Sequence, residues 1–522
     1  MNYVGTARPI HDAKGKATGY SKYASDISLS NMAYLCMLHS KIPHGYVKAV
    51  HAEKALALPG VYGVYHCLNT SERKYNRYRS SFDQAYLANE ERAFNQYVRF
   101  VGDKIGAVAA CDQETAEKAA RLVEVEYEEL PFSIGFDDTL AGKNCLDGET
   151  PVRDEYELDV GEKQGSAEGL IEVCSTMELP RLHHATMETH ACIADYDPYG
   201  DMLTVYCPNQ AVHGIRTVLA DFLEMPESHV RVVKATMGGS FGAKQEWFLE
   251  PVTALVAKKL CRPVKLVYSR GEAMTDTIVR GAMRMSARGY YTPDGEMKEI
   301  YCDVTLDAGA YIGNAGDYVR ALAGKPTRCY RIPYMHYHGQ VISSNSPVSG
   351  AFRSWSAAEE ALMMERQLDA AAEKLGMDRL VIRLKNVARS GEEDKKLHLS
   401  LEDIRIGDAI TLGSEKFGWD KLKAEDAAFN ASQQRYRRGV GIGIGGHGNT
   451  YFPRFNDYGE GSISLNADGS MQANFTLHDH GCGTVTAMRM IAAEVLKVPE
   501  DKIYMTEGDT AVTPIDYGCF AS

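Results

Sequence analysis

A glycine-rich stretch is the feature of this sequence with the clearest chemical potential. Residues Ala235–Glu246 read Ala-Thr-Met-Gly-Gly-Ser-Phe-Gly-Ala-Lys-Gln-Glu and lie between a strand-like run, Val230–Val233, and a helix-like run, Glu246–Leu260. Such a turn lets backbone N–H groups approach an anion or a large polar cofactor. It lacks the Gly-Lys-Ser/Thr of a phosphate loop and the Gly-x-Gly-x-x-Gly of dinucleotide-binding folds. The stretch therefore predicts either another kind of cofactor loop or a plain strand-to-helix turn.

Two groups of histidines could suggest a metal site. One group is His183, His184 and His190, and the other is His478 and His480. Adjacent and unmatched spacings do not place imidazoles on one face of a helix or strand, as metal ligands require. We therefore expect no metal bound directly by these side chains.

Composition narrows the functional class. The formal net charge is −13 and the pI is about 5.7, which argues against nucleic-acid binding. No apolar run is long enough for a membrane helix, and Met1–Ile10 lacks the pattern of a secretory signal. The 12 cysteines are scattered without Cys-x-x-Cys, so iron–sulfur clusters and zinc ribbons are not expected in this chain. These features predict a cytoplasmic protein with small-molecule or protein partners, and no nucleic-acid or membrane partner.

The 522 residues suggest three or four domain-sized units of mixed α+β type. Composition and periodicity divide the chain into five parts. Residues 1–135 form a first unit of strands and helices, and 136–168 an acidic glycine-rich linker. Residues 169–390 are a second unit rich in strands and helices, 391–435 a polar irregular excursion over the surface, and in 436–522 the pattern of strands and helices resumes. Within these units we expect two helices, 209–225 with Asn209 at the N-cap and 357–375 closed by Gly376, and two hairpins, 283–291 with 297–306 and 462–465 with 471–477.

An internal repeat links the two later units. One segment runs from Gln210 through a helix and Phe222-Leu-Glu-Met-Pro226-Glu to a strand. The other runs from Gly483 through a helix and Val495-Leu-Lys-Val-Pro499-Glu to a strand. Such self-similarity predicts two related α/β halves around one site.

Several motifs, taken together in their order along the chain, resemble the molybdenum-cofactor subunit of the xanthine dehydrogenase/aldehyde oxidase family of molybdenum hydroxylases. They are Lys16-Ala-Thr-Gly19-Tyr-Ser-Lys-Tyr23-Ala-Ser-Asp26, Pro43-His44-Gly45, Gly102–Ala110 with Thr115–Ala120, Gly238-Gly239-Ser240-Phe241-Gly242, Ala351-Phe352-Arg353, Asp479-His480-Gly481-Cys482-Gly483 and Thr513–Ser522. The resemblance covers nearly the whole chain. It implies an N-terminal α/β-hammerhead domain in residues 1–135, a first molybdopterin-binding half in 169–390 and the start of a second half in 436–522.

The resemblance also implies a reaction and its cofactors. Members of this family hydroxylate an electron-poor carbon with oxygen derived from water. The cofactor would be molybdenum–molybdopterin, in its plain or its cytosine dinucleotide form, and the metal would be held through the pterin. Iron–sulfur clusters and FAD would lie on partner chains, and the substrate would be a purine or another small N-heteroaromatic compound.

By the same resemblance, certain residues would hold the cofactor, and others would contact the substrate or the metal oxygens. The cofactor set is Gly238, Gly239, Phe241, Gly242, Arg353, Gly481, Cys482 and Gly483. Gln210 matches a glutamine near a molybdenum oxygen, and its alternative role is a polar residue at a helix start. Arg353 would orient substrate through its planar guanidinium, unless it forms a structural salt bridge.

Three further positions would line the substrate site. Arg320 resembles a substrate arginine of purine-type members, and its alternative is a surface arginine. Trp355 stands where the family has a pocket aromatic, although an aromatic residue there is also typical of a core. Gln245 stands where some purine enzymes have a substrate-binding glutamate.

The sequence also departs from the family pattern. Ser354-Trp355-Ser356 replaces Gly-aromatic-Gly, so the added side chains would crowd a closely approaching cofactor, and Cys482 replaces a glutamine. The sequence stops at Ser522, before the Gly-Glu motif whose glutamate is the family's general base. Two hypotheses follow. Either another chain completes the molybdenum domain of a split hydroxylase, or this is a truncated, catalytically inactive member.

Overall fold

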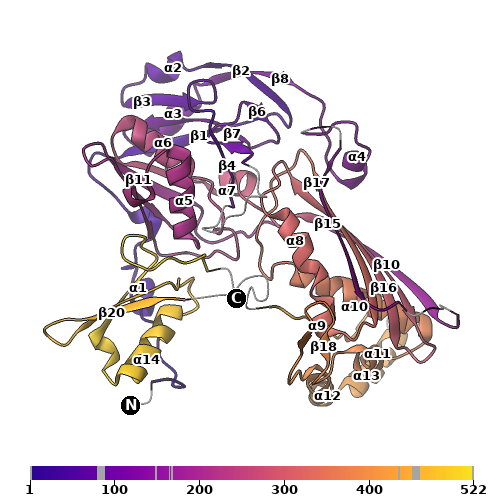
Figure 1. Ribbon diagram of the computed structural model, residues 1–522. Helices are drawn as coiled ribbons and strands as arrows, with labels where there is room; N and C mark the ends of the chain where they lie inside the picture. Colours follow the sequence, from indigo (N-terminus) through magenta and orange to yellow (C-terminus); the bar gives the residue numbers. More distant parts are fainter. Residues whose placement is uncertain are drawn as a thin grey trace.

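The computed structural model describes residues 3–78, 89–146, 148, 150–163, 165, 168–432, 435–448 and 459–519. The chain is organised around two large mixed sheets and a small C-terminal sheet (Figure 1). Part of the predicted linker, residues 147, 149, 164, 166 and 167, and Phe520–Ser522 of the last motif, lie outside the described residues. No helix in the described ranges combines the length and apolarity needed to cross a membrane.

The first sheet has seven strands in the order β13-β12-β11-β14-β1-β7-β3. It joins two groups of strands: β1 (Ala33–His39), β3 (Val61–His66) and β7 (Lys104–Ala110) with β11 (Ala191–Asp197), β12 (Met202–Cys207), β13 (Val230–Lys234) and β14 (Val264–Val267). The groups meet where β1 pairs in parallel with β14, with Ala33 opposite Val264. Helices α5 (Val212–Leu223) and α6 (Glu250–Leu260) pack on the later strands. The hammerhead region therefore shares one sheet and one core with the first cofactor half.

Smaller elements complete the hammerhead region. They are α1 (Ala13–Thr18), β2 (Gly45–His51), α2 (Glu53–Leu56), β4 (Lys74–Tyr75), β5 (Glu91–Arg92), β6 (Tyr97–Val98), α3 (Gln113–Ala120), β8 (Glu124–Glu129) and α4 (Phe136–Leu140). Strands β6, β2 and β8 form a three-stranded sheet, and β4 pairs with β5.

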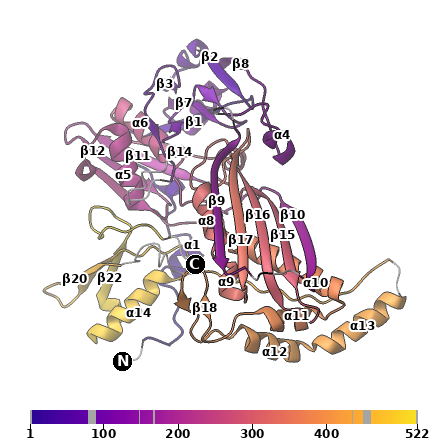
Figure 2. The ribbon, with the colours of Figure 1, turned by 45° about the vertical axis from the view of Figure 1, so that its right-hand side comes forward.

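The second sheet has five long strands in the order β10-β15-β16-β17-β9, seen side by side in Figure 2. They are β9 (Val152–Gly161), β10 (Ile171–Leu179), β15 (Ala282–Tyr291), β16 (Met297–Gly309) and β17 (Tyr334–Ser343). Around this sheet lie α8 (Ala315–Ala323), α9 (Pro326–Cys329), α10 (Ala357–Leu375), α11 (Arg379–Asn386), β18 (Glu393–Asp394) and β19 (Leu399–Ser400). Helix α7 (Arg270–Asp276) belongs instead to the core of the first sheet, which includes its Ala273. The predicted hairpin β15–β16 and the predicted helix α10 are confirmed, and Gly376 closes α10 with φ 64°.

Three sequence expectations are wrong. The supposed linker contains β9, which pairs with β17 along its length. Its alternating charged residues resemble a loop, but Leu158 and Val160 face the core. The excursion at 391–435 is not irregular, because it holds α12 (Ile406–Phe417) and α13 (Trp419–Ser432). Asn209 is not the cap of α5, which starts at Val212. Its side chain instead accepts from Ala211 N at 2.9 Å and donates to Glu246 O at 2.9 Å.

The internal repeat is confirmed at the C-terminus, in β20 (Gly461–Leu465), β21 (Met471–Phe475), α14 (Thr484–Leu496) and β22 (Ile503–Glu507). Strands β20 and β21 form the predicted hairpin, as β11 and β12 do, and β21 pairs in parallel with β22 as β12 does with β13. Both helices end on a left-handed residue, Glu224 (φ 55°) and Lys497 (φ 58°). The two halves are therefore copies of one α/β unit.

The two copies meet at β13 and the segment after β22, where Val233 and Asp509 form an antiparallel bridge. Lys234 N donates to Gly508 O at 2.7 Å, and Thr510 N donates to Val232 O at 3.0 Å. The Arg231 guanidinium donates to both oxygens of Asp509, at 3.0 and 2.6 Å. This junction brings the C-terminal segment against the glycine-rich stretch that follows β13.

We expect Asp509→Ala to loosen that junction. Two charge-assisted hydrogen bonds of about 1.5–3 kcal/mol would be lost, so the population opened at 508–519 rises about tenfold or more. Limited proteolysis followed by mass spectrometry measures cleavage in this segment. Asp403→Ala removes an exposed pair with Arg405 and is the control. Equal cleavage in the two variants would contradict the expectation.

Candidate functional site

The glycine-rich stretch forms the loop between β13 and α6, and its backbone presents free donors. Gly239 (φ 99°), Phe241 (φ 55°) and Gly242 (φ 103°) all lie in the left-handed region. The N–H groups of Gly239, Ser240, Phe241 and Gly242 make no hydrogen bond with the residues that the structure describes. Successive uncommitted N–H groups with alternating backbone conformation form a concave anion- and oxygen-binding surface. We call residues Gly239–Gly242 the amide cradle.

Gly238, which the resemblance assigns to the cofactor, does not offer a free N–H as the cradle residues do. Its N–H donates to Glu188 Oε2 at 2.7 Å, so this amide is already used inside the protein. A Cβ at Gly238 would lie 2.4 Å from Glu188 Cβ. Gly238 is thus a glycine because Glu188 packs against it, a cause that its sequence neighbourhood does not reveal.

A second loop, Ala351-Phe352-Arg353, packs directly against the cradle. A Cβ on Gly242 would lie 2.6 Å from Ala351 O and 3.0 Å from Phe352 N, so only glycine allows this contact. The two motifs lie more than 100 residues apart in the sequence, but in the fold their backbones are in direct contact. The resemblance places both at the cofactor, and the structure brings them together.

Two of the histidines hold these loops. His190 Nε2 donates to Ala243 O at 2.9 Å, and His184 Nε2 donates to Ala351 O at 2.7 Å, because a carbonyl can only accept. Burial lowers the pKa of His184 to about 4 and that of His190 to about 3, so both rings are neutral near pH 7. Sequence reasoning missed this role, because each acceptor is a backbone atom distant in sequence.

Gln210 lies where the cradle meets the C-terminal segment. Its side chain is buried, accepts a hydrogen bond from Ser240 Oγ and donates to Cys519 O at 2.6 Å. Its backbone N donates to Lys244 O at 2.9 Å, and its backbone O accepts from Cys519 N at 2.9 Å. A carboxamide nitrogen carries two donors, so one amide N–H has no acceptor among the described residues.

Arg353 precedes a strained turn. Ser354 (φ 74°), Trp355 (φ 33°) and Ser356 (φ 63°) are three consecutive non-glycine residues in the left-handed region. Such positions cost about 1–3 kcal/mol each and cluster at functional sites. The turn keeps a glycine-like backbone although two serines replace the family's glycines, and Ser356 is fully buried rather than open to a ligand.

The Arg353 guanidinium is exposed and forms no ion pair within the described ranges. Its carbonyl is held instead, by Arg280 Nη2 at 2.8 Å and by Ser354 Oγ at 2.5 Å. Arg280 also lies over the Phe352 ring, at 4.3 Å from its centroid, and pairs with buried Glu359. The backbone of this turn is therefore fixed while the Arg353 side chain is left available.

The three expected substrate residues have different environments. Gln245 is buried just beyond the cradle, and its backbone N–H donates to Gly242 O at 3.2 Å. Trp355 is half-buried, and its ring lies 4.9 Å from that of Tyr318. Arg320 is held by Asp154 on β9 through two hydrogen bonds of 2.5 and 2.8 Å, as expected for a structural arginine.

The second-half loop at Asp479–Gly483 caps α14. The Asp479 carboxylate accepts from the N–H groups of Gly481, Gly483 and Val485, at 2.7, 3.3 and 3.2 Å. Burial opposes ionisation, but these donors lower the pKa of Asp479 below its usual value. The amides of Gly481 and Gly483 are thus already used, while the exposed Cys482 thiol lies 3.0 Å from Thr484 Oγ1.

A buried acid lies beneath both loops. Glu246 is 1% exposed, its Oε1 is 3.5 Å from Asn314 Nδ2, and its Oε2 has no partner among the described residues. Burial raises its pKa from 4.5 to about 8, so the side chain is protonated at neutral pH. It is therefore a neutral group within the core of the site.

We predict that Glu246→Gln flattens the dependence of stability on pH. A raised folded-state pKa stabilises the protein fully below pH 4.5, and that contribution is lost as the pH rises through about 8. The neutral amide cannot titrate, so the slope of the unfolding free energy between these pH values should fall by up to about 1.4 kcal/mol per pH unit. Urea unfolding across this range measures it, and identical slopes for the two proteins would contradict the assignment.

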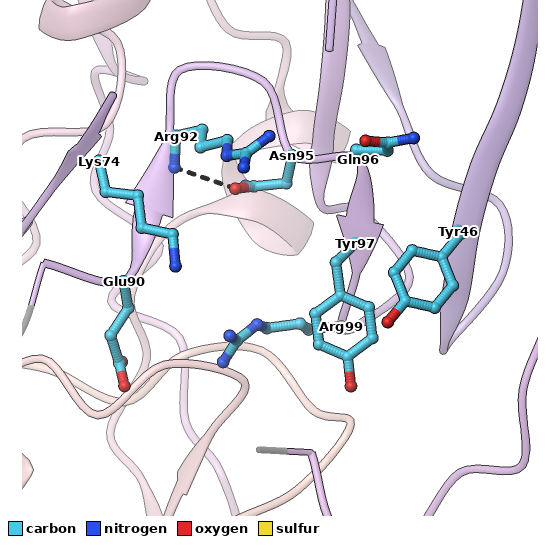
Figure 3. A pocket seen from close by; sticks show the side chains of 8 residues that line it. All are labelled: Tyr46, Lys74, Glu90, Arg92, Asn95, Gln96, Tyr97 and Arg99. Carbon is cyan, nitrogen blue, oxygen red and sulfur yellow. Dashed lines mark hydrogen bonds between the residues drawn. The ribbon is translucent and has the colours of Figure 1, made fainter. Parts of the chain in front are cut away.

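A pocket of about 160 Å³ lies apart from these loops, in the hammerhead region (Figure 3). It is lined by Tyr46, Lys74, Glu90, Arg92, Asn95, Gln96, Tyr97 and Arg99. Several of its polar groups serve the framework: Tyr97 OH donates to Leu146 O at 2.6 Å, and Glu90 pairs with Arg153 at 2.5 Å. We therefore place the functional site at the two loops and not here.

Comparison with known proteins gives matches along most of the chain. Residues 18–131 match the aldehyde oxidase and xanthine dehydrogenase a/b hammerhead domain, and residues 152–387 and 412–522 match two molybdopterin cofactor-binding domains. The xanthine dehydrogenase molybdenum-binding subunit of Escherichia coli O157:H7 is 30% identical over 98% of this chain and 68% of its own length. The carbon monoxide dehydrogenase large chain of Hydrogenophaga pseudoflava is 29% identical, over 97% and 66%. The crystal structure of quinoline 2-oxidoreductase from Pseudomonas putida 86 superposes with a TM-score of 0.90 at 22% identity, covering 100% of this chain and 68% of that one.

Proposed function

The chain belongs to the xanthine dehydrogenase and aldehyde oxidase family of molybdenum hydroxylases, as a molybdenum-binding large subunit, and from this premise we propose how its residues work. We propose that it holds molybdenum–molybdopterin for the hydroxylation of a purine or another N-heteroaromatic substrate. The observation that carries the cofactor assignment is the amide cradle, whose N–H groups have no partner within the described ranges.

The residues present fit such a cofactor. The cradle offers uncharged donors to pterin and metal oxygens, and glycines remove the Cβ atoms that would block close approach. Gln210 has one amide N–H beside the cradle that no described residue accepts. When bound, the cofactor supplies the redox chemistry in which a substrate carbon gains an oxygen derived from water.

The substrate side would be formed by Arg353, Gln245 and Trp355. An available guanidinium can donate two parallel hydrogen bonds to a carbonyl or to a developing anion. Gln245 can donate or accept where a glutamate could only accept, and the Trp355 ring can stack on a flat heterocycle. The substrate class rests on the xanthine dehydrogenase relative, at 30% identity, while the carbon monoxide dehydrogenase relative is nearly as similar, at 29%.

Partners are a further part of the proposal. Electrons would leave through iron–sulfur and FAD-bearing subunits, and the C-terminal half would need more polypeptide, either a continuation of this chain or a separate one. In the first half, α6 packs on β11 over Ala194 and Tyr196. The corresponding residues on β20, Ile463 and Leu465, are 42% and 69% exposed. An apolar sheet face of this kind calls for an equivalent helix.

The test is turnover in isotopically labelled water. The complex purified from its own cells is supplied with hypoxanthine, xanthine or nicotinate and an artificial electron acceptor in H₂¹⁸O, and products are analysed by mass spectrometry. We expect one of these rings to gain a single ¹⁸O atom. Oxidation of carbon monoxide alone would overturn the substrate class, and no turnover by a cofactor-loaded complex would favour the inactive alternative.

A further inference from the structure

We propose that Glu188 is the positioning residue of the amide cradle. It lies in the segment between β10 and β11, about 50 residues before the loop it contacts, and nothing in the cofactor motifs includes it. The inference rests on the proposed function, in that the cradle is taken to be the cofactor-binding element. Glu188 itself need not touch the cofactor.

One carboxylate oxygen of Glu188 holds both ends of the loop. Glu188 Oε2 accepts from Gly238 N at 2.7 Å, immediately before the cradle, and from Lys244 Nζ, two residues beyond it. In addition, Glu188 N donates to Gly238 O at 3.0 Å. The side chains of Glu188 and Lys244 are 10% and 1% exposed, so solvent does not screen this pair.

These contacts engage the groups on either side of the cradle. Glu188 Oε2 accepts from the amide before the cradle and from the ammonium after it, whereas Glu188 Oε1 is buried without a partner among the described residues. The ion pair with Glu188 also engages the Lys244 ammonium, so Lys244 does not offer a free cation to the loop. Burial lowers the pKa of Lys244, and the Glu188 charge opposes that shift. The cradle therefore presents N–H dipoles rather than an ammonium ion.

The neighbouring contacts make the segment a template for both loops. His190 and His184, on either side of Glu188, donate to Ala243 O and Ala351 O. Arg270 Nη2 donates to the carbonyls of Thr186 and Met187, at 2.5 and 3.0 Å, and so fixes the segment from behind. Among these contacts Glu188 is the one that pairs with Lys244, and its loss leaves Lys244 buried without that partner.

The experiment is a double-mutant cycle with two readouts, using the complex from its own cells. Glu188→Gln keeps the shape and an acceptor for Gly238 N but strands the Lys244 charge, and Lys244→Met strands the carboxylate. The double variant removes both charges. Hydrogen exchange of the amides at 238 and 243–245 reports the loop, and the release rate of pterin from folded protein reports cofactor holding.

We expect each single variant to raise both rates about tenfold or more, and the double variant to return them to within about threefold of the original. Glu365→Gln is the matched control, because Glu365 is 12% exposed and pairs with Arg383 at 2.8 Å in another part of the core. It should lower the thermal midpoint without changing either rate. Rates within twofold of the original in both single variants would overturn the inference, as would equal effects in the control. A complex that holds no pterin would instead refute the proposed function, and hydrogen exchange would still decide the role of Glu188.

Discussion

Gly242→Ala is expected to abolish cofactor binding while the chain still folds. The substitution places a methyl group 2.6 Å from Ala351 O at a backbone φ of 103°. Conformational strain of about 1–2 kcal/mol adds to overlap of about 1–3 kcal/mol, and the overlap is with backbone that cannot swing aside. The cheapest relief is separation of the cradle from the Arg353 loop. We expect at least a tenfold loss of molybdenum and pterin per folded chain.

Gly376→Ala separates strain from overlap. Gly376 also has a positive φ, 64°, but an added Cβ there meets no atom within 4 Å. We expect this variant to lose about 1 kcal/mol of stability and to keep its full cofactor content. If the two alanine variants lose the cofactor equally, or if neither does, the close packing of the two loops is not what shapes the site.

Arg353→Ala is expected to lower kcat/KM by about 10²–10³ and to leave cofactor content unchanged. The reason is the loss of a planar guanidinium that no carboxylate within the described ranges engages. Arg353→Lys should recover little, because an ammonium cannot make two parallel hydrogen bonds. Steady-state kinetics on the cofactor-loaded complex, with metal analysis of the same samples, measure the effect.

Arg320→Ala is the comparison for Arg353. Asp154 already accepts two hydrogen bonds from the Arg320 guanidinium, so we expect kcat/KM to change by less than about twofold. A large loss of kcat/KM in Arg320→Ala, with little loss in Arg353→Ala, would make Arg320 the substrate arginine and Arg353 a structural one. A lower cofactor content in Arg353→Ala would assign that arginine to holding the cofactor rather than the substrate.

Local patterns in the sequence predicted much of this architecture. Helix α10, with Gly376 at its end, and the β15–β16 hairpin follow from periodicity and turn residues that act over a few positions. The repeated Pro226 and Pro499 predicted two α/β copies, since each proline stands between a helix and the next strand. Strand β9 was missed because half of its residues are charged and only its pairing with β17 makes it a strand.

The candidate site could be predicted only in part. The glycine motif and Arg353 were identified by resemblance, because their chemistry is carried in short runs of sequence. The residues that hold them, Glu188, His184 and His190, contact backbone atoms 50 or more positions away, and no local pattern records such contacts. The sequence also does not show which N–H groups form hydrogen bonds within the fold. It therefore did not reveal that the amides of Gly238 and Gly481 donate to protein carboxylates.

The most direct test of the central claim is the molybdenum and pterin content of the protein isolated from its own cells. The claim is that this chain, through its amide cradle, holds molybdopterin. Metal analysis and fluorescence of the oxidised pterin should give about one molybdenum and one pterin per chain, and both should disappear in Gly242→Ala. The claim would be contradicted if the folded protein, isolated with the partners that co-purify, contained neither molybdenum nor pterin.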